Sequence, residues 1–339
     1  MAFSMVQVSS NENPGTDGSS PGKGAAGWKP TSLPLEFRVG EIELRTVNLN
    51  GLVYRGLFGD PDFPVGGPPP PAELLGGEVE AALVYSAPVT EALPRLGHEH
   101  GVLRYVPSQY RRHFLDLRDG TFPQYLEGFS SKTRSTLRRK VRKWSESQAG
   151  PDQPAMRVYR TPAEIETFLG LARGLSEKTY QERLLGRGLP TEPAFYAEML
   201  ALAAEDQLRG YLLFSKEQPA AFLLCPIREG CVLYEWVGYD PAFATFSPGT
   251  VLQFLALEHL FGEERHRLFD FTEGEGEHKA FWARGHAPCA DIYYLRPTLR
   301  NRALVGGHAG LHLASRAAVH LLDRYGVKAR LKRLLRQGT

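Results

Sequence analysis

The amino-acid sequence predicts an α/β protein whose sheet is mixed and mostly antiparallel, with one parallel strand pair. Three strand-like segments, 208–215, 219–227 and 231–239, are joined by short turns and predict an antiparallel meander. A nearly all-apolar helix over 249–261 and a further strand over 267–272 follow. Such a helix crosses over the sheet, and the strand after it therefore closes a parallel pair.

The composition is that of an ordinary globular chain and does not identify a partner. The 339 residues are enough for two packed units, because domains typically hold about 100–200 residues. Hydrophobic residues make up 42% and charged residues 23%, with a net charge of +2. Cys225, Cys231 and Cys289 lack a paired metal-ligand spacing, which favours small buried side chains, and we expect no metal site.

We divide the chain into four segments. Residues 1–34, rich in Gly, Ser, Pro and Asn, predict a disordered tail, and residues 35–125 predict a first, mostly β unit. Residues 126–298 predict the second unit, and residues 299–339 a basic amphipathic helical tail. The first residues lack the basic start and apolar run of a signal peptide, and no window approaches the roughly 18 apolar residues of a membrane span. We therefore expect a cytoplasmic protein.

The first unit reads as strands separated by loops. A proline cluster over 66–77 interrupts them and predicts a surface loop. The expected strands cover residues 41–47, 51–58, 78–86, 101–106 and 113–118.

The second unit begins with helices. Thr161 and Glu164 form a capping box with Pro162 at the first helical position, and the apolar stripe runs through Leu175. Thr191 is expected to start the next helix.

A strongly basic helix precedes these two, over residues 129–146. Leu137, Val141 and Trp144 share one face, while seven basic residues and no acidic ones stand between Lys132 and Lys143. Like charges four residues apart repel, so a polyanion partner is favoured over a merely solvated face. Residues 131–144 could bind coenzyme A phosphates, tRNA, an acidic carrier protein or lipid headgroups. Arg138 is our candidate for binding the donor on this helix.

The turn within FDFTEGEGEHKAFWARG, residues 269–285, holds unusual chemistry. Phe269 and Phe271 alternate with Asp270, which places Asp270 at the C-terminal end of a central strand, beside the crevice where ligands bind in α/β sheets. We expect a catalytic role for Asp270. The alternative is a structural hydrogen bond within the turn.

Charged side chains fill the rest of that turn. Gly274 and Gly276 allow the backbone to fold tightly. Three glutamates would attract an ammonium-bearing acceptor, although one or two of them only solvate the loop. His278 could exchange a proton near neutral pH, and Lys279 could bind a donor phosphate or an acceptor carboxylate. The glutamates are Glu273, Glu275 and Glu277.

The segment Ser247-Pro248-Gly249-Thr250 opens the apolar helix. Amides in the first turn of a helix are unpaired and lie at the positive end of its dipole, so they stabilise an anion. Gly249 lets a pyrophosphate approach the backbone, and Ser247 or Thr250 can add a hydroxyl donor. The alternative is a well-capped helix start without a ligand.

Taken together, these residues resemble the BioF2-like acyltransferases, a branch of the GNAT N-acyltransferases related to the Fem aminoacyl-tRNA-dependent transferases. The resemblance covers about residues 125–298 and includes the basic helix. The phosphate loop of ordinary GNAT enzymes carries two spaced glycines, where this chain has one, and a Tyr usually stands where His278 does. The matching positions are Tyr239-Asp240-Pro241, Ser247-Pro248-Gly249, Asp270, Gly274 and Lys279.

The resemblance implies tandem GNAT-like units and a transfer reaction in the second. The strand before the apolar helix would splay from the next one and hold an acyl thioester, with acyl-CoA as co-substrate or an acyl carrier protein in its place. An amine of a small molecule would attack the carbonyl directly. Glu235, beside the expected thioester, is the first candidate for the base; the alternative is an outward-facing strand glutamate.

Two other functions stay open at this stage. A Fem-like transferase would use aminoacyl-tRNA, which the basic helix and the missing second glycine favour. A non-catalytic GNAT-fold module would bind a polyanion or a membrane. The tail at 299–339 could contact an anionic membrane as an amphipathic helix, but we expect its leucines to pack on its own domain.

Overall fold

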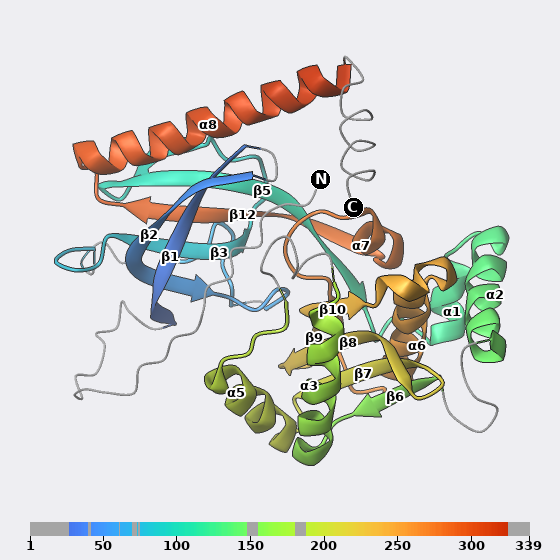
Figure 1. Cartoon of the computed structure of the whole chain (residues 1–339). Coiled ribbons are helices and arrows are strands. Elements are labelled where there is room, and N and C mark those ends of the chain that lie inside the picture. The colour runs from blue at the N-terminus through green and yellow to red at the C-terminus, as the bar shows by residue number, and fades with distance from the viewer. Residues whose placement is uncertain are drawn as a thin grey trace. The chain divides into compact units, whose positions relative to one another are not determined.

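The computed structural model describes residues 27–39, 42–60, 62–69, 73, 75–147, 155–179 and 188–324 (Figure 1). The chain divides into two compact units, which we call the central and the flanking unit. The central unit consists of residues Arg112–His286. The flanking unit consists of the described residues before Arg112 and after His286. The predicted boundaries at 125 and 298 therefore differ from the observed ones, because β5 and β12 each contribute residues to both units.

The central unit contains a mixed sheet with helices on both faces. Its strand order is β5-β11-β9-β8-β7-β6, and β10 pairs with β8 beside this path. The elements in chain order are β5 (Val102–Asp116), α1 (Phe122–Glu127), α2 (Ser131–Ser147), β6 (Met156–Tyr159), α3 (Pro162–Ser176), α5 (Pro193–Ala204), β7 (Leu208–Ser215), β8 (Gln218–Arg228), β9 (Cys231–Leu233), β10 (Trp236–Tyr239), the 3-10 helix η1 (Pro241–Phe246), α6 (Pro248–Gly262), β11 (Leu268–Asp270), α7 (Glu277–Trp282) and β12 (Gly285–Leu295).

The pairing confirms the predicted fold class. The strands β6 to β9 are antiparallel neighbours, β11 is antiparallel to β5, and β11 runs parallel to β9. The crossover helix α6 connects the two strand ends that this parallel pair requires. The capping box expected at Thr161 is also present, since Glu164 N–H lies 3.4 Å from Thr161 Oγ1 and the Glu164 carboxylate accepts from Thr161 N–H at 2.9 Å.

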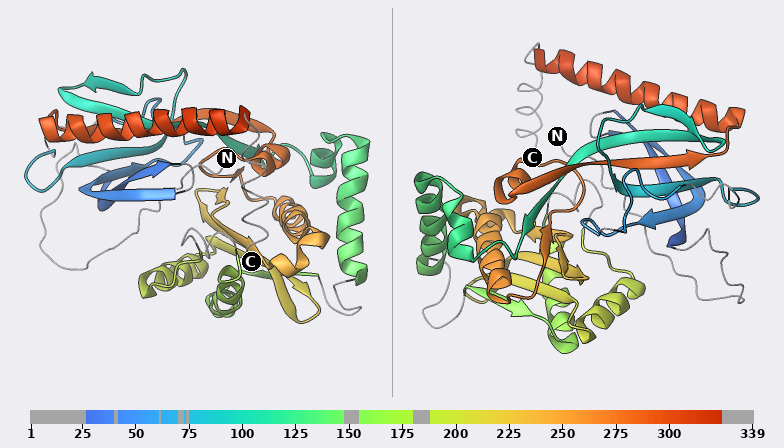
Figure 2. Two further views of the ribbon diagram at one scale, coloured as in Figure 1. Left: turned by 45° about the horizontal axis from the view of Figure 1, so that its top comes forward. Right: turned by 180° about the vertical axis from the view of Figure 1, so that it is seen from behind.

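The apolar character of α6 follows from its position. In Figure 2 it lies between the strands β7 and β8 and the helices α1 and α2, and it contacts all four. Alternate residues of β8 face opposite ways: Leu223 packs in the cluster that contains α6, whereas Leu224 packs with α3 and α5. A helix covered on two sides needs apolar side chains around most of its circumference.

The flanking unit contains further strands with mixed pairing and a helix packed on them. The strand β1 is antiparallel to β2, β2 is parallel to β3, and β3 is antiparallel to β12. Val305 and Ala309 of α8 pack in a cluster with strand residues such as Leu33 and Leu49. The helix therefore packs on its own unit through these two residues, whereas Leu313, one of the leucines expected to pack there, is 60% exposed. The further elements are β1 (Trp28–Val39), β2 (Ile42–Arg55), β3 (Ala81–Pro88), β4 (Leu96–Glu99) and α8 (Leu299–Arg324).

Several expectations for the ends of the chain need correction. Residues 28–34, assigned to the disordered tail, belong to β1, whose buried positions Leu33 and Leu35 alternate along the strand. Residues 1–26 and 325–339 of the two predicted tails lie outside the described residues. Cys225 and Cys231 are buried thiols, as predicted, and Cys289 is buried as well. Among the described residues, no helix combines the length and apolarity that a membrane crossing needs.

Candidate functional site

The strand predicted over 231–239 is broken in the middle, and the break forms the centre of the site. The parallel pairing of β9 with β11 ends at Leu233 and Asp270. Tyr234 N–H then donates to Asp270 O at 2.9 Å, and Thr272 Oγ1 donates to Tyr234 O at 3.1 Å. The next strand, β10, pairs with β8, so within the described strands the parallel neighbours part after Tyr234. Glu235 is the first residue beyond that point.

Glu235 lies on the side of the sheet that faces α6. Just after Glu235, Trp236 packs with Phe195 of α5, whereas Val237 packs on the opposite face, against the cluster containing α6. Burial first, and then the nearby Glu235 carboxylate, raise the pKa of the Cys225 thiol, which belongs to that same cluster. The half-buried Glu235 carboxylate is therefore directed towards the helix side of the opening.

Asp270 is not an exposed acid beside a crevice. Its carboxylate is fully buried and accepts from Arg112 Nε at 3.0 Å and from Arg112 Nη2 at 2.5 Å. Oδ1 also accepts from Thr272 N–H at 2.9 Å. A carboxylate with both oxygens bound and no exposed surface is poorly placed to reach a substrate, so the placement of Asp270 favours the alternative, a structural hydrogen bond within the turn, over the catalytic role.

This ion pair holds the turn that follows β11. Arg112 Nη1 lies 3.5 Å from the Glu273 carboxylate, and the Glu273 carbonyl accepts from Lys279 Nζ at 2.5 Å. Gly274 has φ +83°, a left-handed backbone that a side chain would strain, so this glycine is required by the turn itself. Glu275 and Glu277 are exposed. Of the three glutamates, Glu273 lies 3.5 Å from Arg112 and belongs to this ion-pair cluster.

Lys279 is buried rather than presented to a ligand. Burial lowers the pKa of its ammonium to about 8, although Glu273 and Asp270 oppose this shift. Its Nζ is engaged with the Glu273 carbonyl, which fixes the turn from within. The role of binding a donor phosphate, predicted for Lys279, therefore has no support in its placement.

The pKa of Lys279 gives a testable pH dependence. The folded chain releases this proton near pH 8, whereas the unfolded chain holds it to about pH 10.4. Between these values the unfolded state binds more protons, so the contribution of Lys279 to the free energy of unfolding increases with pH. We expect the difference in unfolding free energy between the wild-type chain and Lys279→Met to rise across this window, measured by urea denaturation. A difference that stays flat would mean that the ammonium is solvated.

His278 and Tyr234 lie together at the mouth of the turn. Their ring centroids are 5.9 Å apart, and His278 is exposed while Tyr234 is buried. Partial desolvation and the adjacent Lys279 ammonium lower the pKa of the His278 imidazole. The ring is therefore largely neutral at pH 7 and can accept a proton, so the proposed proton-exchange role of His278 fits its position.

The start of α6 presents fewer amides than the sequence suggests. Ser247 adopts a left-handed backbone with φ 56°, and its carbonyl accepts from the N–H groups of Thr250 and Val251 at 3.0 and 3.1 Å. Pro248 has no N–H. Among the described residues, Gly249 therefore has the one first-turn amide left for a ligand, and a Cβ added there would meet nothing closer than Tyr239 Cδ1 at 4.0 Å.

A lysine of the basic helix lies next to this helix start. Lys143 Nζ stands 4.8 Å from the ring centroid of Phe246, the residue before Ser247, and Trp144 packs against Phe243 of η1. The end of α2 is thus placed beside the start of α6. The sequence indicated a basic helix at this site but could not show which of its cations would be near.

Gln253 is a candidate that the sequence analysis did not select. It is buried in α6, and its Nε2 has no hydrogen-bond partner among the described residues. It follows Gly249 by four residues on the same helix face, and helical side chains lean back over the preceding turn. The signal in the sequence was a single amide in an otherwise apolar stretch, which is weak without the burial.

Residues 131–280 match the family model described as an acetyltransferase (GNAT) domain. This segment is a GNAT acyltransferase domain. No match to a protein of curated function was found. In the described part of the chain, no group of three or more His, Cys, Asp or Glu side chains could hold a metal ion.

The GNAT domain and its surroundings also have structural neighbours. The chain is similar to L-PGS from Bacillus licheniformis, with 16% identity, 86% of each chain covered and a TM-score of 0.47. It is also similar to FemX, with 10% identity, coverage of 82% of this chain and 90% of FemX, and a TM-score of 0.44.

Within the GNAT domain, the predicted residues fall into three places. Glu235 and His278 flank Tyr234 at the opening between β10 and β11, with Asp270 and Lys279 buried behind it. The start of α6, with Ser247, Gly249 and Thr250, lies beside Tyr239 at the other end of β10, roughly 13 Å along the strand. Arg138 belongs to neither group: it lines a pocket with Phe254 and Glu258, beyond the first turn of α6.

Proposed function

We propose that this GNAT domain transfers an acyl group from a thioester to an amine by direct attack. The proposal rests on one observation: the parallel strands part after Tyr234, and a half-buried carboxylate stands at that opening. Parted strands leave backbone donors unpaired by a neighbour, and such donors stabilise the negative charge that develops on an attacked carbonyl oxygen. The match of residues 131–280 to the GNAT family supports the same reaction class.

In this proposal Glu235 and His278 accept protons at different steps. The amine must lose a proton as it attacks, and the Glu235 carboxylate accepts it directly or through one water. The neutral His278 imidazole is placed to accept the proton of an acceptor that arrives as an ammonium. The new bond joins the amine nitrogen to the acyl carbon, and the carbon–sulfur bond breaks. The leaving thiolate takes its proton from water.

Gln253 and the start of α6 would hold the donor. The free Nε2 of Gln253 can donate to a carbonyl of the donor arm, on the face that also carries Gly249. The phosphates would meet the Gly249 amide, the hydroxyls of Ser247 and Thr250, and the Lys143 ammonium. One amide is a weak phosphate site by itself, so we assign a large part of donor affinity to Lys143.

A thermal-shift experiment tests the donor. We expect acetyl-CoA or a long-chain acyl-CoA to raise the melting temperature of the full chain, by about 2–4 °C for each kcal/mol of binding free energy gained. Lys143→Gln should reduce this rise, because it removes the cation beside the helix start. Lys132→Gln, at the far end of the same helix, is the matched control and should leave the rise unchanged. No stabilisation by either thioester would refute a coenzyme A donor.

Aminoacyl-tRNA is the second candidate donor, favoured by the basic face of α2. A groove of about 640 Å³ runs along this helix and is lined entirely by serine and arginine side chains. Hydroxyl and guanidinium groups are the usual ligands of a nucleic-acid backbone. Stabilisation by tRNA alone, with an affinity that falls steeply as salt is added, would select this donor over the thioester. The lining residues are Ser131, Arg134, Ser135, Arg138, Arg139 and Arg142.

A further inference from the structure

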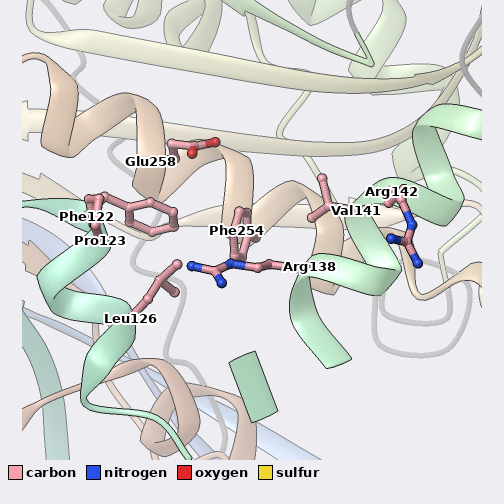
Figure 3. Close-up of a pocket in the computed structure, with 8 residues that line it drawn as sticks. All are labelled: Phe122, Pro123, Leu126, Arg138, Val141, Arg142, Phe254 and Glu258. Atoms are coloured by element: carbon pink, nitrogen blue, oxygen red, sulfur yellow. The ribbon is translucent and has the colours of Figure 1, made fainter. Parts of the chain in front are cut away.

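A pocket of about 350 Å³ opens between α1, α2 and α6 in the central unit (Figure 3). It lies on a different face of α6 from the candidate donor site, since Phe254 follows Gly249 by five residues, or about 140° around the helix. Most of its wall is apolar, and two arginines and one glutamate complete it. The lining residues are Phe122, Pro123, Leu126, Val141, Phe254, Arg138, Arg142 and Glu258.

The two arginines bring positive charge to this apolar wall. Figure 3 shows the side chain of Arg138 extending from α2 towards Leu126 and Phe254. Among the described residues, no carboxylate forms an ion pair with Arg138, and Arg142 pairs only with the exposed Glu146 at 3.8 Å. Glu258 also lines the pocket, but no ion pair joins it to either arginine in the described part of the chain. Both guanidinium groups are exposed, and they are therefore available to an anionic ligand that enters the pocket from solution.

The apolar part of the pocket suits an aliphatic chain better than a nucleic-acid base. Phe122 and Phe254 pack edge to face, with ring centroids 5.0 Å apart and an interplanar angle of 85°. They are only 5% and 6% exposed, so neither offers an open ring face on which a base could stack. Flexible methylene groups, in contrast, can follow the irregular wall that these rings form with Leu126 and Val141.

The serine- and arginine-lined groove along α2 continues from this pocket. Arg138 and Arg142 line both cavities. Arg134 is anchored by bonds from Nη1 to the carbonyls of Glu127 and Phe129, which holds one end of the groove in place. An apolar chamber that opens onto guanidinium and hydroxyl groups matches a molecule with a chain at one end and a phosphate at the other.

We propose that this pocket binds an amphiphilic phosphate, with its aliphatic chain among Phe122, Leu126 and Phe254 and its phosphate on Arg138. The site uses another face of α6 than the proposed thioester site and none of the candidate catalytic residues, although Arg138 and Arg142 also line the groove considered for aminoacyl-tRNA. The phosphate amphiphile can come from solution or from a membrane lipid, and the experiment separates these two sources.

Calorimetric titration of the full chain with dodecyl phosphate, below its critical micelle concentration, tests the proposal. We expect saturable binding that Arg138→Gln weakens by about tenfold or more, since a charge-assisted hydrogen bond is lost. Val141→Phe should weaken it comparably by filling the apolar chamber. Lys132→Gln removes a charge from the same helix outside both cavities and should leave the affinity within about twofold of wild type. Circular dichroism verifies that each variant is folded.

Three comparison ligands decide the outcome. Inorganic phosphate should bind far more weakly, and equal binding would show an adventitious ion only. Dodecyl maltoside carries the chain without the charge, and binding equal to that of dodecyl phosphate would overturn the role of the arginines. Vesicles of phosphatidic acid that sediment the wild-type chain but not Arg138→Gln would identify a membrane lipid as the source. Dodecyl phosphate binding that both pocket variants leave unchanged would place the ligand elsewhere and overturn the proposal.

Discussion

Replacing Glu235 by Gln is expected to lower the turnover number of acyl transfer by about 10²–10⁴-fold, the range that a positioned general base contributes. The amide has nearly the same shape as the carboxylate but cannot accept the proton of the attacking amine. Because Glu235 stands at the edge of the opening and is only half buried, the variant should keep the fold. Release of free thiol from the acyl-CoA that stabilises the chain best, in the presence of a mixture of amines, measures the effect.

Glu277→Gln is the matched control for this variant. Glu277 is exposed in the same turn region and belongs to α7, outside the described ion-pair cluster. Its loss should change turnover by no more than a small factor. If Glu235→Gln retained near wild-type turnover while His278→Gln lost it, the base would be the imidazole, and the carboxylate at the opening would be an ordinary strand glutamate.

Replacing Asp270 by Asn is expected to destabilise the chain by about 3–5 kcal/mol, because it leaves the Arg112 guanidinium buried without its counter-charge. Arg112→Met should cost a similar amount for the reciprocal reason. The double variant removes both charges and should cost much less than the sum of the two single changes. Urea denaturation of the full chain gives the three free energies of unfolding.

An exposed ion pair provides the comparison for that cycle. Asp116 and Arg118 lie 2.9 Å apart on the surface, and Asp116→Asn should cost less than about 1 kcal/mol. If Asp270→Asn proved equally harmless to stability yet abolished turnover, the structural role given to Asp270 would be wrong and the catalytic role expected from its sequence position would return.

The fold of the central unit was largely predictable because its elements carry strong local signals. The meander of β7, β8 and β9 follows from apolar strand composition and short turns, and the capping box at Thr161 marks the start of α3. The apolar helix α6 and the strand after it led directly to the parallel pair. The strand β1 was missed because tail-like residues precede it and its alternation begins only at Leu33.

The geometry of the site was harder to predict from the sequence. The sequence around Tyr234 and Glu235 contains no signal that a strand ends there, since aromatic and apolar residues continue on both sides. The ion pair of Asp270 joins residues 158 positions apart, so local patterns could not reveal that the carboxylate is neutralised. Pro248 predicts that one amide is missing from the helix start, because proline has no N–H. The left-handed backbone of Ser247 could not be predicted from the sequence.

The position of Arg112 limits where the chain can be truncated to give a stable domain. The match to the GNAT family starts at residue 131, yet the guanidinium that neutralises the most deeply enclosed carboxylate of that segment comes from β5, nineteen residues earlier by their numbers. A fragment trimmed to the family borders would carry Asp270 as a solitary charge in its core. Cloning for expression should therefore begin upstream of β5, and transfer of this domain into other proteins would succeed only if β5 were included.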